Sequence, residues 1–256
     1  PHFSNGYFAN GIVVKNAWYP MLDNVKITSE YGDSHGKMAA GFALLDCYSP
    51  LVDKCYFWGG AEYGLLYRSE IDSEDGIVSD CYFVGQDTGI RVRLSARTDG
   101  WGEPAFHLTD SHIHYKVKGL ALKGIRQGFV SGNLFYCFNR AASRWHADPD
   151  SVSSYTSKDI ECDAVNDFIV SHNQFAEPAS PKRVCIDILP NSGNLLIDGN
   201  IFNMDGTAIR NRSQVSSRCI GNVYTGSPDF TKSADGANAL IRYVDPNGTL
   251  KTLDFE

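Results

Sequence analysis

The chain has 256 residues, 43% of them apolar and 21% charged, with a formal net charge of −7. This composition predicts one folded domain, residues 1–256, with a long continuous core and no disordered linker. The negative charge argues against nucleic-acid binding, which requires a basic face. No apolar run approaches the roughly 18 residues of a membrane span, so we expect no membrane insertion.

Short segments that alternate apolar and polar residues recur along the chain, and many of them open on glycine. They are expected to be strands at 11–14, 41–44, 64–67, 89–94, 119–123, 160–163, 184–188 and 208–210. Alternation with period two marks strands with one buried and one exposed side. No segment has sustained helical periodicity, so helix is expected to be limited to a turn or two.

A second motif lies between these strands: a small or polar residue is followed two places later by an aromatic or β-branched one. It occurs at 25–27, 55–57, 81–83, 111–113, 133–135, 173–175, 200–202 and 222–224, at spacings of 22 to 40 residues. Such a period is typical of stacked repeats. We predict an all-β fold, a right-handed parallel β-helix of about eight coils over residues 10–225 with loop insertions. Leucine-rich horseshoes and β-propellers are alternatives, but they require more regular repeats.

The last four motifs begin with asparagine, at Asn133, Asn173, Asn200 and Asn222. Coils stacked at about 4.8 Å would align these amides into a ladder of hydrogen bonds, so we interpret them as structural. Residues 226–256 are predicted to form a terminal hairpin or cap. The chain begins in mid-pattern and without a signal peptide, which predicts a fragment of a longer protein.

Seven cysteines occupy mostly apolar positions of the repeat. They lack the CxxC spacing of metal sites, and the acidic turn at 70–76 lacks the spacing of a calcium loop, so we predict neither a metal nor a cofactor. Cys55 and Cys81 share a motif position in adjacent coils, where they can stack as thiols or, alternatively, form a disulfide. Free thiols indicate synthesis in a reducing cytoplasm.

The outward residues of successive strands are expected to form columns along the axis, which suits a long polymeric ligand. Alignment on the inward residues predicts one column of Arg68, Arg93, Lys123, Asp163, Asp187 and Arg210, and a second of Leu66, Arg91, Ala121, Glu161, Cys185 and Ala208. The first column places carboxylates between cations.

Glycoside hydrolysis needs one protonated and one ionised carboxyl group. The alignment predicts Asp163 one coil from Asp187, at about 5 Å, and Glu161 on the diagonal to Asp187, at about 8 Å. The longer separation suits an inverting hydrolase, and crowding of like charges is expected to raise one pKa. We therefore predict Glu161, Asp163 and Asp187 as catalytic. Alternatively, they are ordinary acids on a solvated face.

A lyase is a second possibility, because elimination from a uronic acid needs cations to neutralise the sugar carboxylate. Arg91, Arg93, Lys123 and Arg210 are the candidates for this role, and equally for substrate binding by a hydrolase. Two expected loops also carry tryptophan, Trp101 and Trp145, and the second loop carries His146. Aromatic rings stack on sugars, so Trp101 and Trp145 are predicted to bind substrate; alternatively, each packs its loop onto the coil. His146 is predicted at the same site, where Asp148 could orient it as a base, although it could also be a solvated loop residue.

The glycine-led strands, the Asn-X-aromatic motifs and the irregular loops together resemble the pectate-lyase-like β-helix superfamily, and within it the polysaccharide depolymerases of bacteriophage tailspikes. The resemblance covers about residues 10–225 and is one of pattern. It implies a homotrimer that binds, and often cleaves, bacterial surface polysaccharide. It also implies a place in the virion tail, acting extracellularly after synthesis in the bacterial cytoplasm.

The predicted function is therefore binding and hydrolysis of a bacterial capsule, O-antigen or exopolysaccharide. A lyase acting on a uronic-acid polymer, a glycan-binding module without catalysis and a purely structural coil segment are the alternatives.

Overall fold

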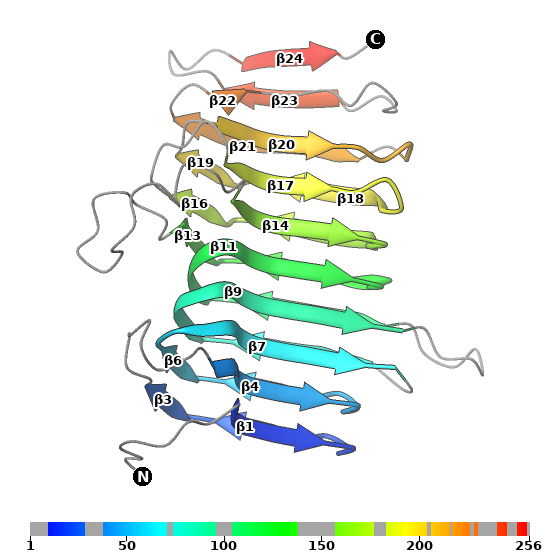
Figure 1. The fold of residues 1–256 in the computed structure, drawn as a ribbon. Coiled ribbons are helices and arrows are strands. Elements are labelled where there is room, and N and C mark those ends of the chain that lie inside the picture. Colours follow the sequence, from blue (N-terminus) through cyan, green and yellow to red (C-terminus); the bar gives the residue numbers. More distant parts are fainter. Residues whose placement is uncertain are drawn as a thin grey trace.

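The computed structural model describes residues 10–28, 38–70, 74–95, 104–137, 157–176, 183–203, 206–215, 217–225, 228–229, 240–244 and 250–254. Within these ranges the chain contains strands, turns and bends but no α-helix. The strands wind into coils that stack along one axis (Figure 1). In none of the described ranges is there a helix long and apolar enough to cross a membrane.

Each coil contributes strands to three walls of one continuous sheet. The long-strand wall consists of β1 (Asn10–Lys15), β4 (Met38–Leu45), β7 (Ala61–Ser69), β9 (Tyr82–Leu94), β11 (His112–Lys123), β14 (Lys158–Asp163), β17 (Val184–Ile188), β20 (Gly206–Asn211) and β22 (Pro228–Asp229).

The second wall consists of β2 (Met21–Asp23), β5 (Leu51–Asp53), β8 (Gly76–Ser79), β10 (Ala105–Thr109), β12 (Gln127–Ser131), β15 (Asn166–Ser171), β18 (Gly193–Asp198) and the first part of β21 (Arg218–Thr225). The third wall consists of β3 (Lys26–Thr28), β6 (Tyr56–Trp58), the first parts of β9 and β11, then β13 (Leu134–Cys137), β16 (Gln174–Ala176), β19 (Ile201–Asn203) and the last part of β21.

The pairing between successive coils is parallel throughout these walls, which confirms the predicted parallel β-helix. At the C-terminal end, β23 (Leu240–Val244) pairs in parallel with β21 and antiparallel with β24 (Leu250–Asp254). The hairpin that the sequence predicted is therefore present in the described part of 226–256.

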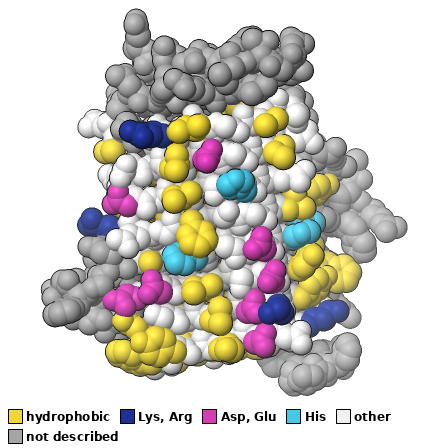
Figure 2. All heavy atoms as spheres, turned by 180° about the vertical axis from the view of Figure 1, so that it is seen from behind, with side chains coloured by type: hydrophobic (Ala, Val, Ile, Leu, Met, Phe, Trp, Pro, Cys, Tyr) yellow, Lys and Arg dark blue, Asp and Glu magenta, His cyan; other side chains and the backbone are white. Residues whose placement is uncertain are grey.

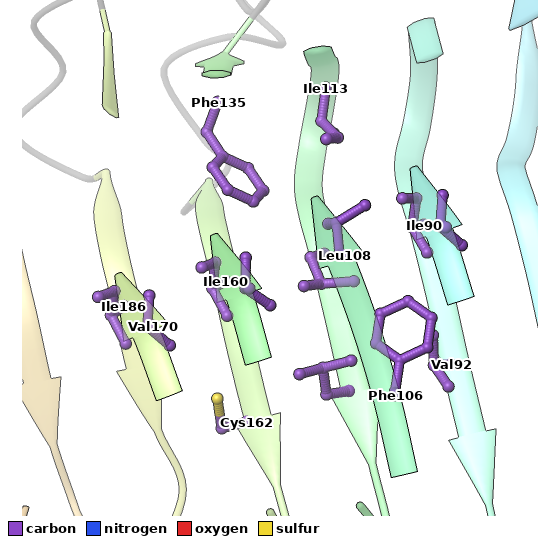
Figure 3. Close-up of a cluster of buried hydrophobic side chains, with 14 of the residues drawn as sticks. Ile90, Val92, Phe106, Leu108, Ile113, Phe135, Ile160, Cys162, Val170 and Ile186 are labelled. Carbon is purple, nitrogen blue, oxygen red and sulfur yellow. The ribbon is translucent and has the colours of Figure 1, made fainter. Parts of the chain in front are cut away.

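The core fills the space between the three walls with side chains that point inward from each of them (Figure 3). The aromatic positions of the second motif stack along the axis: the ring centroids of Phe135 and Phe175 are 5.4 Å apart, those of Phe175 and Phe202 4.8 Å, and those of Phe202 and Tyr224 4.9 Å. All four rings are buried. The repeat seen in the sequence is therefore a repeat of the core.

A ladder of side chains holds the corner between the second and third walls. The backbone N–H of Asn133 donates to Asn173 Oδ1 at 3.0 Å, and that of Asn173 donates to Asn200 Oδ1 at 2.9 Å. The asparagine ladder is thus confirmed. It extends further than expected, because Ser111 and Cys81 accept the same bond from the preceding coil, at 3.0 and 3.3 Å. All seven cysteines are buried and free, so the possible Cys55–Cys81 disulfide is absent.

The glycines that open the long strands lie at the corner between the third and long-strand walls. A Cβ at Gly64 would lie 2.4 Å from the backbone oxygen of Gly89, and one at Gly89 2.7 Å from that of Gly119. The next coil has Asp159 at this place, and its buried carboxylate is bound by Arg183 at 2.9 and 2.7 Å and by the Tyr115 hydroxyl at 2.6 Å. A buried charge is tolerated there because it is fully paired.

The ladder predicts a stability effect at Asn173. Replacing Asn173 by Ala removes the acceptor for the Asn133 backbone and the donor to Val130, leaving buried polar groups unsatisfied. We expect a loss of about 2–4 kcal/mol in the free energy of unfolding, measured by urea denaturation. The adjacent exposed residue provides the control, since Gln174→Ala should change stability by less than about 0.5 kcal/mol. Equal effects of the two changes would contradict a structural role for the ladder.

Candidate functional site

The predicted site residues that the structure describes lie on the outward side of the long-strand wall. We define the charged face by the charged side chains there: Arg68, Arg91, Arg93, Lys118, Lys123, Lys158, Glu161, Asp163, Asp187, Arg210 and Arg212. Trp101, Trp145 and His146 lie outside the described residues. Their predicted role in substrate binding stays a prediction.

The register of the strands sorts these residues into two columns. Arg68, Arg93, Lys123 and Asp163 follow one another in consecutive coils, as predicted. Asp187 does not continue this column. It pairs with Glu161 on one side and with Arg210 on the other. The expected alignment of Asp163 with Asp187, and the diagonal placement of Glu161, were therefore wrong by two residues in β17.

Asp187 is the centre of an ion-pair network. Although it faces outward, its side chain is completely buried under cations. Arg210 binds it with two hydrogen bonds of 2.9 and 2.7 Å, and Arg212 and Lys158 each lie 2.7 Å from Oδ2. This arrangement saturates both carboxylate oxygens. Arg210 is engaged in this network, and its predicted role in substrate binding stays a prediction.

Glu161 shares this network with Asp187 through a common lysine. Lys158 lies between them and binds both carboxylates, while Lys118 binds Glu161 Oε1 at 2.6 Å. Four cations (Lys118, Lys158, Arg210 and Arg212) thus surround two carboxylates, which leaves the network with a net positive charge. A substrate that meets this network therefore meets cations first.

The electrostatics differ from the expectation that crowding would raise one pKa. Burial acts to raise the pKa of Asp187, but hydrogen bonds and charges from Arg210 and Lys158 outweigh it, and the pKa is lowered. For Glu161 burial likewise acts to raise the pKa, but hydrogen bonds and charges from Lys118 and Lys158 outweigh it, and the pKa is lowered. Both groups are therefore ionised at neutral pH, and neither is prepared to donate a proton.

Asp163 and Lys123 form a separate pair at the edge of the charged face. Their side chains are 2.7 Å apart and partly exposed. Such pairs contribute little to stability because water screens them. Lys123 is therefore only partly available to a ligand.

Three arginines remain without a carboxylate partner among the described residues. Arg68 and Arg93 are exposed and adjacent in consecutive coils, and Arg91 lies two residues before Arg93 on the same strand. Stacking like charges at the interstrand spacing of about 4.8 Å is unfavourable unless an anion neutralises them. This row is the part of the charged face best suited to bind an anionic ligand.

The sequence analysis missed Lys158 and Arg212 as members of the site. Lys158 lies outward on β14, and in the sequence it stands three residues before Glu161. Arg212 directly follows β20, and its position beside Asp187 depends on the turn that it opens. Strand alternation places Lys158, an odd number of residues from Glu161, on the opposite side, so the repeat did not indicate it, whereas Arg212 stands two residues after Arg210 and shares its side. No group of three or more His, Cys, Asp or Glu residues in the described ranges is arranged to hold a metal ion.

Comparison with known proteins adds one distant likeness to this description. The chain matches no family model and no curated protein. Among solved structures it is similar to the crystal structure of the periplasmic alginate epimerase AlgG, with 12% identity and a TM-score of 0.45. The match covers 84% of this chain and 59% of that one, so the chain spans less than two thirds of that protein's length. No residue role is transferred from it.

The lowered pKa values predict how stability depends on pH. Above the ordinary carboxyl range of about pH 4–5, the network makes its full contribution to the free energy of unfolding. This contribution is lost as the pH falls below that range, because the unfolded chain then binds more protons than the folded one. Asp187→Asn should lower the free energy of unfolding by about 2–3 kcal/mol at pH 7, since it leaves Arg210 and Arg212 without a carboxylate and Lys158 with Glu161 alone. It should also make the loss of stability below pH 5 shallower.

Urea denaturation between pH 7 and pH 3 measures both effects. Asp163→Asn is the matched control, and because its pair is partly exposed it should cost less than about 1 kcal/mol. If Asp163→Asn destabilises the protein as much as Asp187→Asn, the network is not centred on Asp187.

Proposed function

We propose that this β-helix recognises an acidic bacterial surface polysaccharide along its charged face, as the receptor-binding part of a bacteriophage tailspike. The row of Arg68, Arg91 and Arg93 is the observation on which this proposal rests. A uronate or another acidic sugar supplies the carboxylate that these arginines lack within the described residues. Arginine is suited to the task because its planar guanidinium binds a carboxylate through two hydrogen bonds.

The geometry of the face favours an extended polymer over a small anion. Arg68, Arg93 and Lys123 repeat once per coil along the axis, so a chain of acidic sugars lying along this direction meets one cation in each coil. The neighbouring network, with its excess of cations, extends the positive surface toward β20. A linear glycan therefore fits both the direction and the charge of the face.

Cleavage of the bound glycan is a separate question. Hydrolysis by Glu161, Asp163 and Asp187 stays a prediction, and the lowered pKa values of Glu161 and Asp187 disfavour either one as the proton donor. A lyase would use the arginines to neutralise the substrate carboxylate and would also need a base beside it. Binding requires only the arginine row, so binding is the activity that the geometry supports best.

The test of binding compares two faces of the same molecule. Arg68→Ala combined with Arg93→Ala should weaken binding of alginate, polygalacturonate or a uronate-containing capsule by about tenfold or more, since each loses a charge-assisted contact. Arg218→Ala removes one positive charge at an exposed site on the second wall and should bind like the wild type, whereas Arg68→Ala and Arg93→Ala should each weaken binding when made singly. Calorimetry at two salt concentrations measures the affinity, and dextran serves as the neutral polymer.

The same incubations test cleavage. We expect binding at neutral pH without release of reducing ends and without the absorbance of an unsaturated uronate. Reducing ends that disappear in Asp163→Asn, Glu161→Gln or Asp187→Asn would instead establish a hydrolase, and the absorbance would establish a lyase. Binding of dextran as tight as that of the acidic polymers would overturn the role of the arginines.

We further propose that the chain forms a homotrimer through the outward side of the second wall. Seen from behind the long strands, hydrophobic side chains follow one another along the axis (Figure 2). The aliphatic face, as we name it, is a column of Met21, Leu51, Ile77, Phe129, Ile169 and Leu196, with His107 between Ile77 and Phe129. An apolar column of this length, interrupted by one histidine, is typical of an interface between copies.

Light scattering measures the number of chains. The wild type should have the mass of three chains, and Ile77→Glu combined with Ile169→Glu should have the mass of one, because the interface would then bury unpaired charges. Ile220→Glu, at an exposed apolar residue outside this column, is the control and should keep the wild-type mass. A single-chain mass for the wild type would reject the trimer.

A further inference from the structure

The outward side of the third wall carries a group of aromatic rings that neither the charged face nor the aliphatic face includes. We define the aromatic face by its six rings: Tyr56, Trp58, Tyr82, His112, His114 and Tyr136. They come from β6, β9, β11 and β13, which are neighbours along the axis (Figure 1). Trp58 and Tyr82 are 40% and 42% exposed.

The rings form two adjacent columns. In the first, the centroids of Tyr56 and Tyr82 are 6.0 Å apart and those of Tyr82 and His112 4.5 Å. The second column contains His114 and Tyr136, 5.1 Å apart, and His112 joins the two columns at 6.1 Å from His114. Consecutive rings thus make a surface along the axis rather than one isolated contact.

Three polar atoms of this surface have no hydrogen bond in the described part of the chain. Neither the Tyr56 nor the Tyr82 hydroxyl has a hydrogen bond there, and His114 Nε2 is buried without one. Burial lowers the pKa of His114 to about 4, with a smaller contribution from His112, so its ring is neutral at pH 7. A ligand for this face should therefore offer both hydrogen-bonding groups and an apolar surface.

We infer that the aromatic face is a binding site for a neutral saccharide chain. Sugar rings have apolar C–H faces that stack on aromatic rings and hydroxyl edges that bond to polar groups, so one ligand satisfies both requirements. An aliphatic protein surface would leave the hydroxyls of Tyr56 and Tyr82 unsatisfied. Lys26 lies 5.2 Å from the centre of the Tyr56 ring, but the residues paired across β6, β13 and the first parts of β9 and β11 include no lysine or arginine, unlike the repeated cations of the charged face. This site is independent of the proposed function, because it uses another wall and another ligand chemistry.

The test uses neutral hexasaccharides as probes: cellohexaose, maltohexaose and a β-1,4-mannohexaose, titrated by calorimetry. At least one should bind the wild type, and Tyr82→Ala should weaken it by about 3- to 10-fold, the range expected for one aromatic contact. Tyr82→Phe keeps the ring and should lose less. Ile201 lies in the same column as Tyr82, three coils beyond His112. Ile201→Ala removes its exposed apolar side chain and should bind like the wild type.

Three results would overturn the inference. The first is failure of all three probes to bind the wild type at millimolar concentration, and the second is equal weakening by Tyr82→Ala and Ile201→Ala. A change in oligomeric mass caused by Tyr82→Ala would show that the face binds another chain and would also overturn it. Arg68→Ala combined with Arg93→Ala should leave binding of the neutral probe unchanged, so the result is separate from that for the acidic polymer.

Discussion

The structure depends on one constraint: every coil must lie directly on the next with its backbone hydrogen bonds made. Parallel pairing fixes the distance between successive coils, so equivalent inward side chains lie directly over one another and must be alike. For the same reason the corners accept few residue types. At one corner the side chain must accept an N–H from the preceding coil, which asparagine, serine and cysteine all do in this chain. At the corner between the third and long-strand walls, backbone and core atoms occupy the space that a Cβ would need, so glycine is found there. The outward residues are not bound by these conditions and can differ from wall to wall.

This freedom explains why three walls with one shared core have three different chemistries. The charged face, the aliphatic face and the aromatic face are columns of outward residues, each continued through several coils by the same register. Because the walls meet at fixed corners, a polymer lying on one of them does not reach the rings or charges of another. The three proposed surfaces, for an acidic glycan, for a neutral glycan and for copies of the chain, would therefore be separate.

The sequence predicted the architecture because the constraint acts on inward residues, which repeat visibly. It did not predict the register between β14 and β17, and the reason is physical. A shift of one residue would turn the apolar side chains outward, but a shift of two preserves the alternation, so the pattern at 184–188 fits both alignments. The length of the turn that follows Ile188 decides between them, and no periodicity encodes it. The aromatic face was not predicted for another reason. The repeated motif is defined by its inward first and third residues, whereas Tyr56 and Tyr82 are its outward middle residues.

The net charge of −7 opposes the binding of a polyanion at long range, but screening by salt limits the range of this repulsion. At physiological ionic strength charges are screened over about 8 Å, so a glycan on the charged face responds to the arginines beneath it and little to carboxylates on other walls. At larger separation the net negative charge of the protein does not attract an acidic glycan, so electrostatic forces do not accelerate their association. Low salt extends both effects: it strengthens the contact with Arg68 and Arg93, and it slows the approach of an acidic polymer. The net charge therefore bears on the rate of association, while the arrangement of side chains on the long-strand wall determines which polymer stays bound.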